Sequence, residues 1–192
     1  RYALNVYNNE GVSYSEPKLK VMGLEIVRSS TPEPIRNVLK DAVKVAITKD
    51  EKALQDFILK ARTEYMLLPP EEIAFPRGVN GIEKYAKADK SVPIHVRGSL
   101  VYNSLLSKYK LTTKYPTIKE GEKIKYIYLK EPNHIQSNII SFPNSLPKEF
   151  DLEKMIDYNT QYEKAFLDPL KIILDSIGWK TEKTSSLDDF FS

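Results

Sequence analysis

The stretch Glu16-Pro-Lys-Leu-Lys-Val-Met-Gly-Leu-Glu-Ile-Val-Arg-Ser-Ser-Thr-Pro32 decides how this chain of 192 residues is organised. Before it, residues 2–7 alternate in the way that is typical of a strand, and residues 8–11 are a turn cluster that ends in Gly. Residues 12–21 can then return as a second strand. At the other end, Thr31-Pro32 is typical of the cap and first position of a helix. The stretch therefore predicts a joint, at which a β-hairpin ends and a helical region begins.

Two helices are predicted after the joint. The first is indicated by apolar residues that recur at every fourth position: Ile35, Leu39, Val43 and Ile47. Asp50 can cap a second helix, which Pro69-Pro70 ends. Its buried stripe is predicted to contain Leu54, Phe57, Ile58, Ala61, Tyr65 and Leu68. Because the connection between them is short, these helices should pack as an antiparallel pair.

The rest of the chain mixes short strands with helices. We predict an extended piece at 73–76, helices at 82–86 and 96–108, strands at 123–129 and 139–142, a helix at 151–177 with Pro169 as a kink or break, and a tail from 184. The predicted fold class is α+β, with an N-terminal hairpin followed by a mainly helical domain that contains a small inserted β element.

Composition excludes several classes of protein. A hydrophobic content of 41% and a charged content of 29% are ordinary for a globular domain. No apolar run approaches the ~20 residues that span a bilayer, so we expect no membrane insertion. The absence of Cys excludes disulfides and thiolate metal sites, and it fits a cytoplasmic protein. The first residue is Arg instead of Met, so we expect the chain to be part of something larger.

Charge is unevenly distributed along the chain. The formal net charge is only +3, but residues 84–130 hold 11 basic and three acidic side chains. Residues 131–192 hold six basic and 11 acidic side chains. A basic middle segment favours contact with a polyanion, and an acidic end favours a different partner. A Lys-rich solvated surface is the simpler alternative.

An independent active site is not indicated. The chain has two histidines and no HExxH motif, and its seven glycines form no phosphate-binding loop. A two-metal site needs clustered carboxylates. The candidates are Asp188-Asp189, which lies in the tail, and Glu71-Glu72, which is more simply a helix start. We therefore predict no catalytic residue, no metal site and no cofactor in this chain.

Two segments are candidates for binding phosphate. The segment 94–103 places His95, Arg97, Ser99, Tyr102 and Asn103 around a predicted helix N-terminus, where backbone N–H groups, a positive dipole end and a guanidinium suit phosphate oxygens. Around the joint, Arg28, Ser29 and Ser30 offer a similar mixture. The alternatives are an ordinary capped surface helix in the first case and simple capping in the second.

The tail carries three large apolar side chains near its polar end: Leu187, Phe190 and Phe191. Exposed aromatic residues on a flexible peptide indicate a partner pocket, and the alternative is that they fold back onto the body.

These segments resemble, in order along the chain, the family B replicative DNA polymerases of T-even-type bacteriophages. Arg1-Tyr2 is similar to the second half of the family's Lys-Lys-Arg-Tyr motif, and residues 15–25 resemble its last palm strand and the exit to the thumb. Ser29-Ser-Thr-Pro32 matches the start of the phage thumb. Residues 94–103 resemble the thumb's His-Ile-Arg-Gly and Leu-Thr-Tyr-Asn segment, and Ser186-Leu-Asp-Asp-Phe190 resembles the family's clamp-binding end.

The resemblance implies a division of the chain and a set of contacts. Residues 1–24 would complete the palm sheet, 25–183 would be the thumb, and 184–192 would be a flexible tail whose Leu187, Phe190 and Phe191 bind a sliding clamp. The thumb would hold primer–template duplex DNA without sequence preference through Arg1, Tyr2, Arg28, Ser29, Ser30, His95, Arg97, Tyr102 and Asn103, with Lys108 and Lys123 adding charge.

The resemblance further implies that the chain is part of a DNA-directed DNA polymerase, a nucleotidyltransferase of DNA replication, in the cytoplasm of an infected bacterium. The catalytic aspartates and their Mg²⁺, the fingers and the exonuclease would lie in the remaining part of the polymerase. One departure is Pro132-Asn133-His134-Ile135, which stands where the family usually has a Gly-Asn-Pro-Phe turn. A truncated polymerase and a split gene are both open. A non-enzymatic adaptor that recruits a polymerase core or a clamp, and a domain of another role, are the alternatives.

Overall fold

A computed structural model describes residues 2–22, 28–87 and 91–182. It is an α+β structure with a two-stranded sheet and a separate three-stranded sheet, as the sequence predicts. Its internal contacts divide the chain into two compact units. The first unit comprises Arg1–Arg28, Glu33–Leu67 and Glu163–Ser192, and the second comprises Ser29–Pro32 and Leu68–Tyr162. The predicted boundaries at residues 24 and 183 stay predictions.

The predicted hairpin is confirmed. Strand β1 (Tyr2–Asn9) pairs in antiparallel fashion with β2 (Val12–Met22) through a two-residue turn at Glu10 and Gly11. Both turn residues have positive φ, 53° and 86°, which is the conformation that suits the right-handed twist of a hairpin and that Gly adopts at no steric cost. Asn8 Oδ1 accepts a hydrogen bond from Gly11 N at 3.1 Å and so closes the turn.

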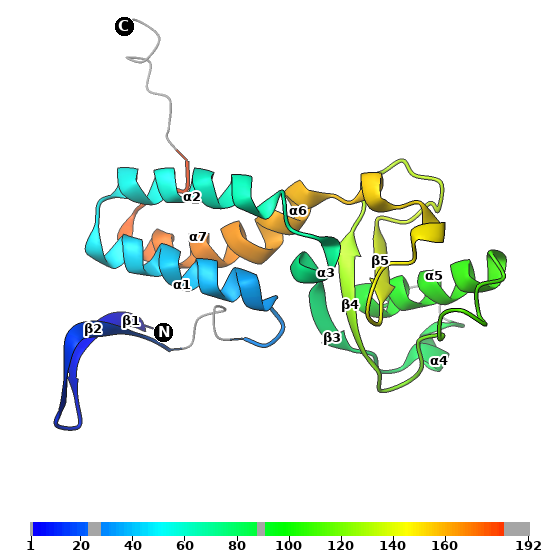
Figure 1. The fold of residues 1–192 in the computed structure, drawn as a ribbon, viewed down its shortest axis with the longest axis horizontal. Helices are drawn as coiled ribbons and strands as arrows, with labels where there is room; N and C mark the ends of the chain where they lie inside the picture. The colour runs from blue at the N-terminus through cyan, green and yellow to red at the C-terminus, as the bar shows by residue number, and fades with distance from the viewer. Residues whose placement is uncertain (1, 23–27, 88–90, 183–192) are drawn as a thin grey trace, which may run out of the picture. The chain divides into compact units, whose positions relative to one another are not determined.

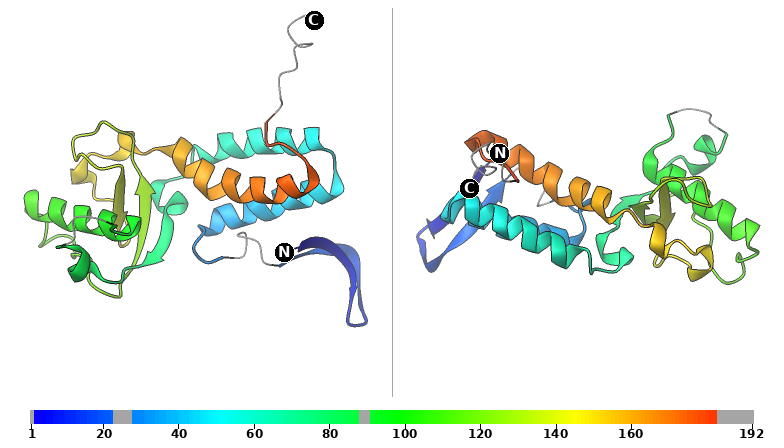
Figure 2. Two further views of the ribbon diagram at one scale, coloured as in Figure 1. Left: turned by 180° about the vertical axis from the view of Figure 1, so that it is seen from behind. Right: turned by 90° about the horizontal axis from the view of Figure 1, so that it is seen from above.

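Three helices of the first unit lie side by side (Figures 1 and 2): α1 (Glu33–Thr48), α2 (Glu51–Tyr65) and α7 (Asp168–Leu174). The predicted cap of α2 is confirmed, because Asp50 accepts a hydrogen bond from Ala53 N at 2.8 Å. Most of the predicted apolar positions are buried, Ile35, Leu39 and Val43 in α1 and Leu54, Ile58, Ala61 and Tyr65 in α2. The prediction is wrong for Ile47, which is 40% exposed at the end of α1, for Phe57, which is half-buried, and for Leu68, which is half-buried and follows the end of α2. Helix α1 begins one residue after Pro32, which was predicted to be its first position.

The second unit is built on a sheet of three antiparallel strands in the order β3 (Phe75–Gly78), β4 (Lys123–Tyr128) and β5 (Ile139–Phe142). Helix α5 (Ile94–Lys108) packs on β5. Three short helices complete the unit, α3 (Pro70–Ile73), α4 (Ile82–Tyr85) and α6 (Tyr158–Tyr162). Both strands predicted between 123 and 142 are confirmed, and the extended piece predicted at 73–76 is β3, two residues later.

The continuous helix predicted at 151–177 is wrong at its beginning. Residues 155–157 instead extend the pairing of β4, because Lys130 N donates to Met155 O at 2.7 Å and Asp157 N donates to Tyr128 O at 2.9 Å. A helix can begin only after this pairing ends, at Tyr158. Farther on, a π-helical turn (Glu163–Leu167) precedes α7, whose first turn holds Pro169. Pro169 has no N–H to donate within a helix, which explains the predicted irregularity there.

Helix α5 and strand β5 approach each other closely at Gly98. A Cβ atom placed on Gly98 would lie 2.5 Å from Ser141 Oγ and 2.9 Å from Ser141 N, so only Gly fits. Ser141 Oγ donates across this contact to His95 O at 2.9 Å, and Ser99 Oγ donates to the same oxygen from within α5 at 2.8 Å. Within the described residues, no helix is both long and apolar enough to cross a bilayer.

Candidate nucleic-acid interface

An open depression of about 390 Å³ in the second unit brings together residues from three parts of the chain. Its lining comprises Ser29, Ser30, Pro76, Arg77, Gly78, Lys123 and Ile124. In the register of β3 and β4, Lys123 is opposite Gly78 and Arg77 is opposite Ile124. The two basic residues Arg77 and Lys123 therefore lie on neighbouring strands. None of these described lining residues is acidic. The structure therefore unites three predicted site residues, Ser29, Ser30 and Lys123, with one that the sequence analysis missed, Arg77.

Arg77 is held in place by backbone oxygens. Its side chain is half-buried, and Nη1 donates to Ser30 O at 3.2 Å and to Pro76 O at 3.1 Å. The sequence contained one signal for it, since Arg77 is a basic residue that directly follows the extended piece predicted at 73–76 and precedes a Gly. That signal became useful only with the register that pairs β3 with the Lys-rich strand β4.

His95 lies in the first turn of α5, close to Arg77. Burial and then the charge of Arg77 both lower the pKa of His95 below its ordinary 6.5. At neutral pH the imidazole is therefore uncharged, and it offers hydrogen bonds without adding to the positive charge. Its ring centroid is 6.4 Å from that of Tyr126.

A second open depression, of about 510 Å³, contains the other two predicted cations of α5. Arg97 and Lys108 line it together with Leu100, Val101, Ser104, Leu105, His134, Ile135 and Gln136. The two cations are separated by 11 residues, about three helical turns, so they share one face of the helix roughly 16 Å apart. Arg97 Nη2 donates to Asn138 Oδ1 at 2.9 Å. The sequence analysis missed His134 and Gln136 as neighbours of this cation pair.

Two neighbouring tyrosines of β4 lie near the guanidinium groups of Arg77 and Arg97. Tyr126 lies near Arg77, whose charge opposes the rise that burial causes in the pKa of Tyr126. Its ring centroid is 6.2 Å from that of Tyr128. Burial also raises the pKa of Tyr128, and the nearby Arg97 charge opposes that rise. We call the candidate phosphate-binding groups in and beside the two depressions the basic strip, which comprises Ser29, Ser30, Arg77, His95, Arg97, Lys108 and Lys123.

Two predicted contacts do not lie on the basic strip. Tyr102 is 1% exposed and packs edge-on against Phe150 with centroids 5.7 Å apart, and burial raises its pKa to about 12. The spacing of Val96, Ser99 and Tyr102 could have indicated this buried face of the helix. Asn103 Nδ2 donates to Ile118 O at 2.9 Å, and Asn103 Oδ1 accepts from Ile118 N at 2.8 Å. Both residues therefore support the unit from within.

The remaining predicted residues belong elsewhere. Arg28 is exposed and belongs to the first unit. Arg1, Leu187, Phe190 and Phe191 lie outside the described residues, as does the side chain of Tyr2. Within the described part of the chain, no three His, Cys, Asp or Glu side chains come close enough together to hold a metal ion.

The last described residues are fixed to α2. Gln55 Nε2 donates to Lys180 O and to Glu182 O, both at 3.2 Å, and Glu51 Oε1 accepts from Lys180 N at 2.8 Å. The apolar residues predicted to bind a partner follow this anchored segment within ten positions.

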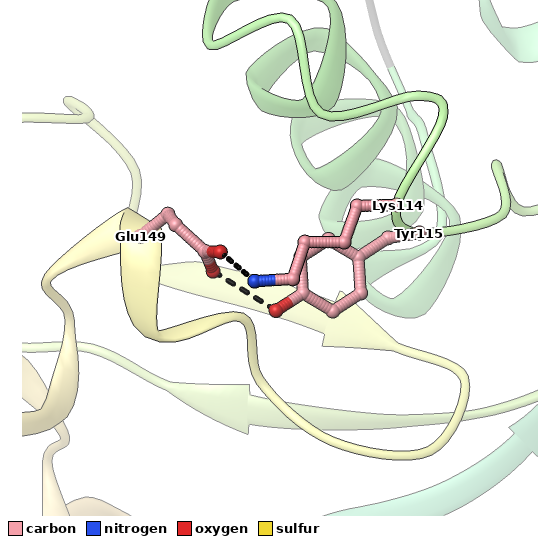
Figure 3. A network of polar contacts seen from close by, with 3 residues as sticks. All are labelled: Lys114, Tyr115 and Glu149. Carbon is pink, nitrogen blue, oxygen red and sulfur yellow. Dashed lines mark hydrogen bonds and ion pairs between the residues drawn. The ribbon is translucent and has the colours of Figure 1, made fainter.

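A third depression, of about 870 Å³, carries charges of both signs and contains a polar network (Figure 3). Glu149 accepts hydrogen bonds from Lys114 Nζ and, at 2.9 Å, from Tyr115 Oη. These contacts connect the loop after α5 to the 3-10 turn Lys148–Phe150. The hydrogen bond from Lys114 is the main reason that the pKa of Glu149 is lowered from 4.5 to about 2.

Acidification should break these hydrogen bonds only at a pH below the ordinary pKa of a glutamate. Because the folded-state pKa of Glu149 lies below its unfolded value, the stabilisation is fully present above pH 4.5 and is lost as the pH falls through about 2. We expect the ring signals of Tyr115 to shift with that low midpoint in an NMR titration, and Glu149→Gln to abolish the shift. A midpoint at 4.5 in the unmodified chain would show that the network does not form.

The chain is similar along its whole length to two phage proteins. It is 34% identical over 200 residues to the DNA-directed DNA polymerase of Enterobacteria phage T4, and 35% identical over 199 residues to that of Escherichia phage RB69. Each alignment covers 100% of this chain and 22% of the relative, so the chain spans about a fifth of the length of these curated relatives. No protein-family model matches it.

Proposed function

Because the whole chain is homologous to one segment of the DNA polymerases of T-even-type phages, we propose that it is the segment that grips the primer–template duplex, and that the basic strip is its DNA-binding surface. The observation that carries the proposal is the gathering of Ser29, Ser30, Arg77 and Lys123 in one depression without acidic residues. In this proposal, residues 1–24 complete the palm and the rest of the body is the thumb.

The basic strip has the chemistry of a surface for duplex backbone. Within the described residues, its cations Arg77, Arg97, Lys108 and Lys123 have no carboxylate partner, so each is available to an external anion. Phosphates are common to all sequences, and contacts to them position a duplex without reading its bases. This is what a replicative polymerase requires of the part that holds its product.

The bond-forming chemistry belongs, in this proposal, to the part of the polymerase outside this chain. There, the primer 3′-hydroxyl attacks a nucleoside triphosphate with the aid of two Mg²⁺ ions. The chain by itself should therefore bind duplex and incorporate no nucleotide.

Salt dependence of duplex binding tests the proposal. Four phosphate contacts predict that log K falls against log salt with a slope of about −3.6, which is −0.9 per phosphate. We expect two duplexes of unrelated sequence to give the same slope and nearly the same affinity in fluorescence anisotropy. A duplex affinity that is independent of salt, or that is confined to one sequence, would contradict it.

We further propose that the tail tethers the polymerase to a sliding clamp through Leu187, Phe190 and Phe191. The anchoring of 180–182 on α2 supports this, because it gives the tail a defined point of attachment near its apolar residues. A tether raises the effective concentration of the enzyme at the primer end. The double variant Phe190→Ala and Phe191→Ala should lose the clamp and keep its duplex affinity. An adaptor, by contrast, would bind duplex weakly and still lose its partner.

A further inference from the structure

We infer that the depression around Arg77 is a discrete site for one phosphate of the duplex backbone, with the Arg77 guanidinium as its central ligand. This deepens the proposed function and depends on it, since the phosphate is supplied by the bound duplex. The inference is that contact with DNA is not spread evenly over the basic strip, because one phosphate position is bound more tightly than its neighbours.

The first argument is the orientation of Arg77. Its Nη1 is committed to Ser30 O and Pro76 O, which fixes the plane of the guanidinium before any ligand arrives. Within the described residues, Nε and Nη2 make no hydrogen bond, so two donors remain for the oxygens of an anion. A guanidinium fixed in this way loses little conformational freedom when it binds, unlike the long, exposed side chains of Lys108 and Lys123.

The second argument is charge. Arg77 is half-buried and has no carboxylate partner among the described residues. Burying a charge without a counter-ion is unfavourable, and a bound anion offsets that cost. His95 is neutral next to it, because burial and Arg77 lower its pKa, so the guanidinium supplies one positive charge, which matches the single negative charge of a phosphodiester. Lys123 also lines the depression, from the neighbouring strand.

The third argument is shape and donor type. Ser29 and Ser30 line the depression together with Arg77, so hydroxyl and guanidinium donors are contributed by two separate segments of the chain. Donors that arrive from different directions suit the tetrahedral oxygens of a phosphate group. In the second depression, by contrast, Arg97 donates to a side-chain oxygen, that of Asn138.

Occupation of the site has a structural consequence. Arg77 already binds the carbonyl of Ser30, and a phosphate that also contacts the Ser29 and Ser30 hydroxyls would hold the segment Ser29–Pro32 onto β3. Duplex binding should therefore slow amide hydrogen exchange at residues 29–31, and it should do so less in a variant that lacks Arg77.

A methylphosphonate scan tests the discrete site directly. Each backbone phosphate of a short duplex is replaced in turn by the neutral methylphosphonate, and affinity for the full chain is measured at low salt. We expect replacement at one position to lower the affinity about 10-fold or more, because one set of charge-assisted hydrogen bonds is lost. Replacement at the other positions should lower the affinity less. In Arg77→Met, methylphosphonate at that same position should leave the affinity almost unchanged, because the guanidinium that binds this phosphate is already missing.

Two further variants protect the test against a loss of folding in Arg77→Met. Lys123→Gln removes an exposed cation of the lining whose side chain makes no hydrogen bond or ion pair among the described residues, and Ser29→Ala removes an exposed hydroxyl without changing charge. Both should reduce the penalty at the same phosphate position. Lys40→Gln, an equal change of charge on α1 in the first unit, should leave the scan unaltered.

The outcomes separate the two proposals. A chain that binds duplex with a flat scan, or with a sensitive position that persists in Arg77→Met, overturns the discrete site and leaves the proposed function in place. A chain that binds no duplex overturns the proposed function, and the backbone site with it. Inorganic phosphate supplies a control for the source of the anion: if it shifts the Ser29 and Ser30 amides while the scan stays flat, the site binds free phosphate and the inference is wrong.

Discussion

The triple variant Arg97→Gln, Lys108→Gln and Lys123→Gln is expected to bind duplex DNA roughly 100-fold more weakly than the unmodified chain at low salt. A hydrogen bond to a charged group contributes about 1.5–3 kcal/mol, and exposed side chains give less because water and salt screen them. The loss of three such contacts should therefore lower the duplex affinity strongly even when each contact is weakened by this screening. All three side chains are exposed, so their replacement should leave the fold intact.

The salt dependence of the triple variant distinguishes lost phosphate contacts from other causes of weak binding. Removing three cations should make the slope of log K against log salt less steep by about 2.7. A matched control is Lys40→Gln, Lys52→Gln and Lys171→Gln, three exposed lysines of the first unit that undergo the same change of charge. If the control loses as much affinity as the test variant, then net charge accounts for binding and the basic strip does not.

Gly98→Val should destabilise the second unit by about 3 kcal/mol or more. Even the first side-chain carbon would lie 2.9 Å from the backbone N of Ser141, and a strand backbone cannot move aside as a flexible side chain can. Helix α5 must therefore shift away from β5, which breaks the hydrogen bond from Ser141 Oγ to His95 O. Overpacking of this kind typically costs 1–3 kcal/mol, and the two added methyl groups increase it.

Urea denaturation followed by the NMR signals of β5 measures this effect on the second unit alone. Ser104→Ala is the control, an exposed position of the same helix where better helix propensity should slightly stabilise the unit. Adding Ser141→Gly to Gly98→Ala should recover only part of the stability, because the contact with the backbone N at 2.9 Å persists. An unchanged free energy of unfolding in Gly98→Val would mean that α5 does not pack on β5 as described. Since Arg97 and Lys108 lie on α5, duplex affinity should fall together with the stability.

Local patterns predicted much of the fold. The turn cluster before Val12 and the alternation around it predicted the hairpin, and Asp50 predicted the start of α2, because turns and caps depend on residues a few positions apart. The helix predicted at 151–177 was wrong at its beginning because that part of the chain depends on contacts between distant residues. The residues at 155–157 pair with the end of β4, about 27 positions earlier in the chain, and no local pattern reports such a pairing.

For the candidate site, too, some features could be predicted from local sequence and others depend on distant contacts. The groups that are available could be listed from the residues alone: a Lys-rich middle, two segments rich in hydroxyls and guanidinium groups, and similarity along the whole chain to phage polymerases. Which of these groups lie close together depends on how distant segments pack. The register of β3 with β4 put Arg77 and Lys123 on neighbouring strands, and Arg77 is hydrogen-bonded to Ser30 O in the depression that Ser29 and Ser30 also line. The packing of α5 turned Tyr102 inward and left Arg97 exposed. The physical reason is that side-chain chemistry belongs to single residues, whereas register and buried faces are chosen by contacts between distant parts of the chain.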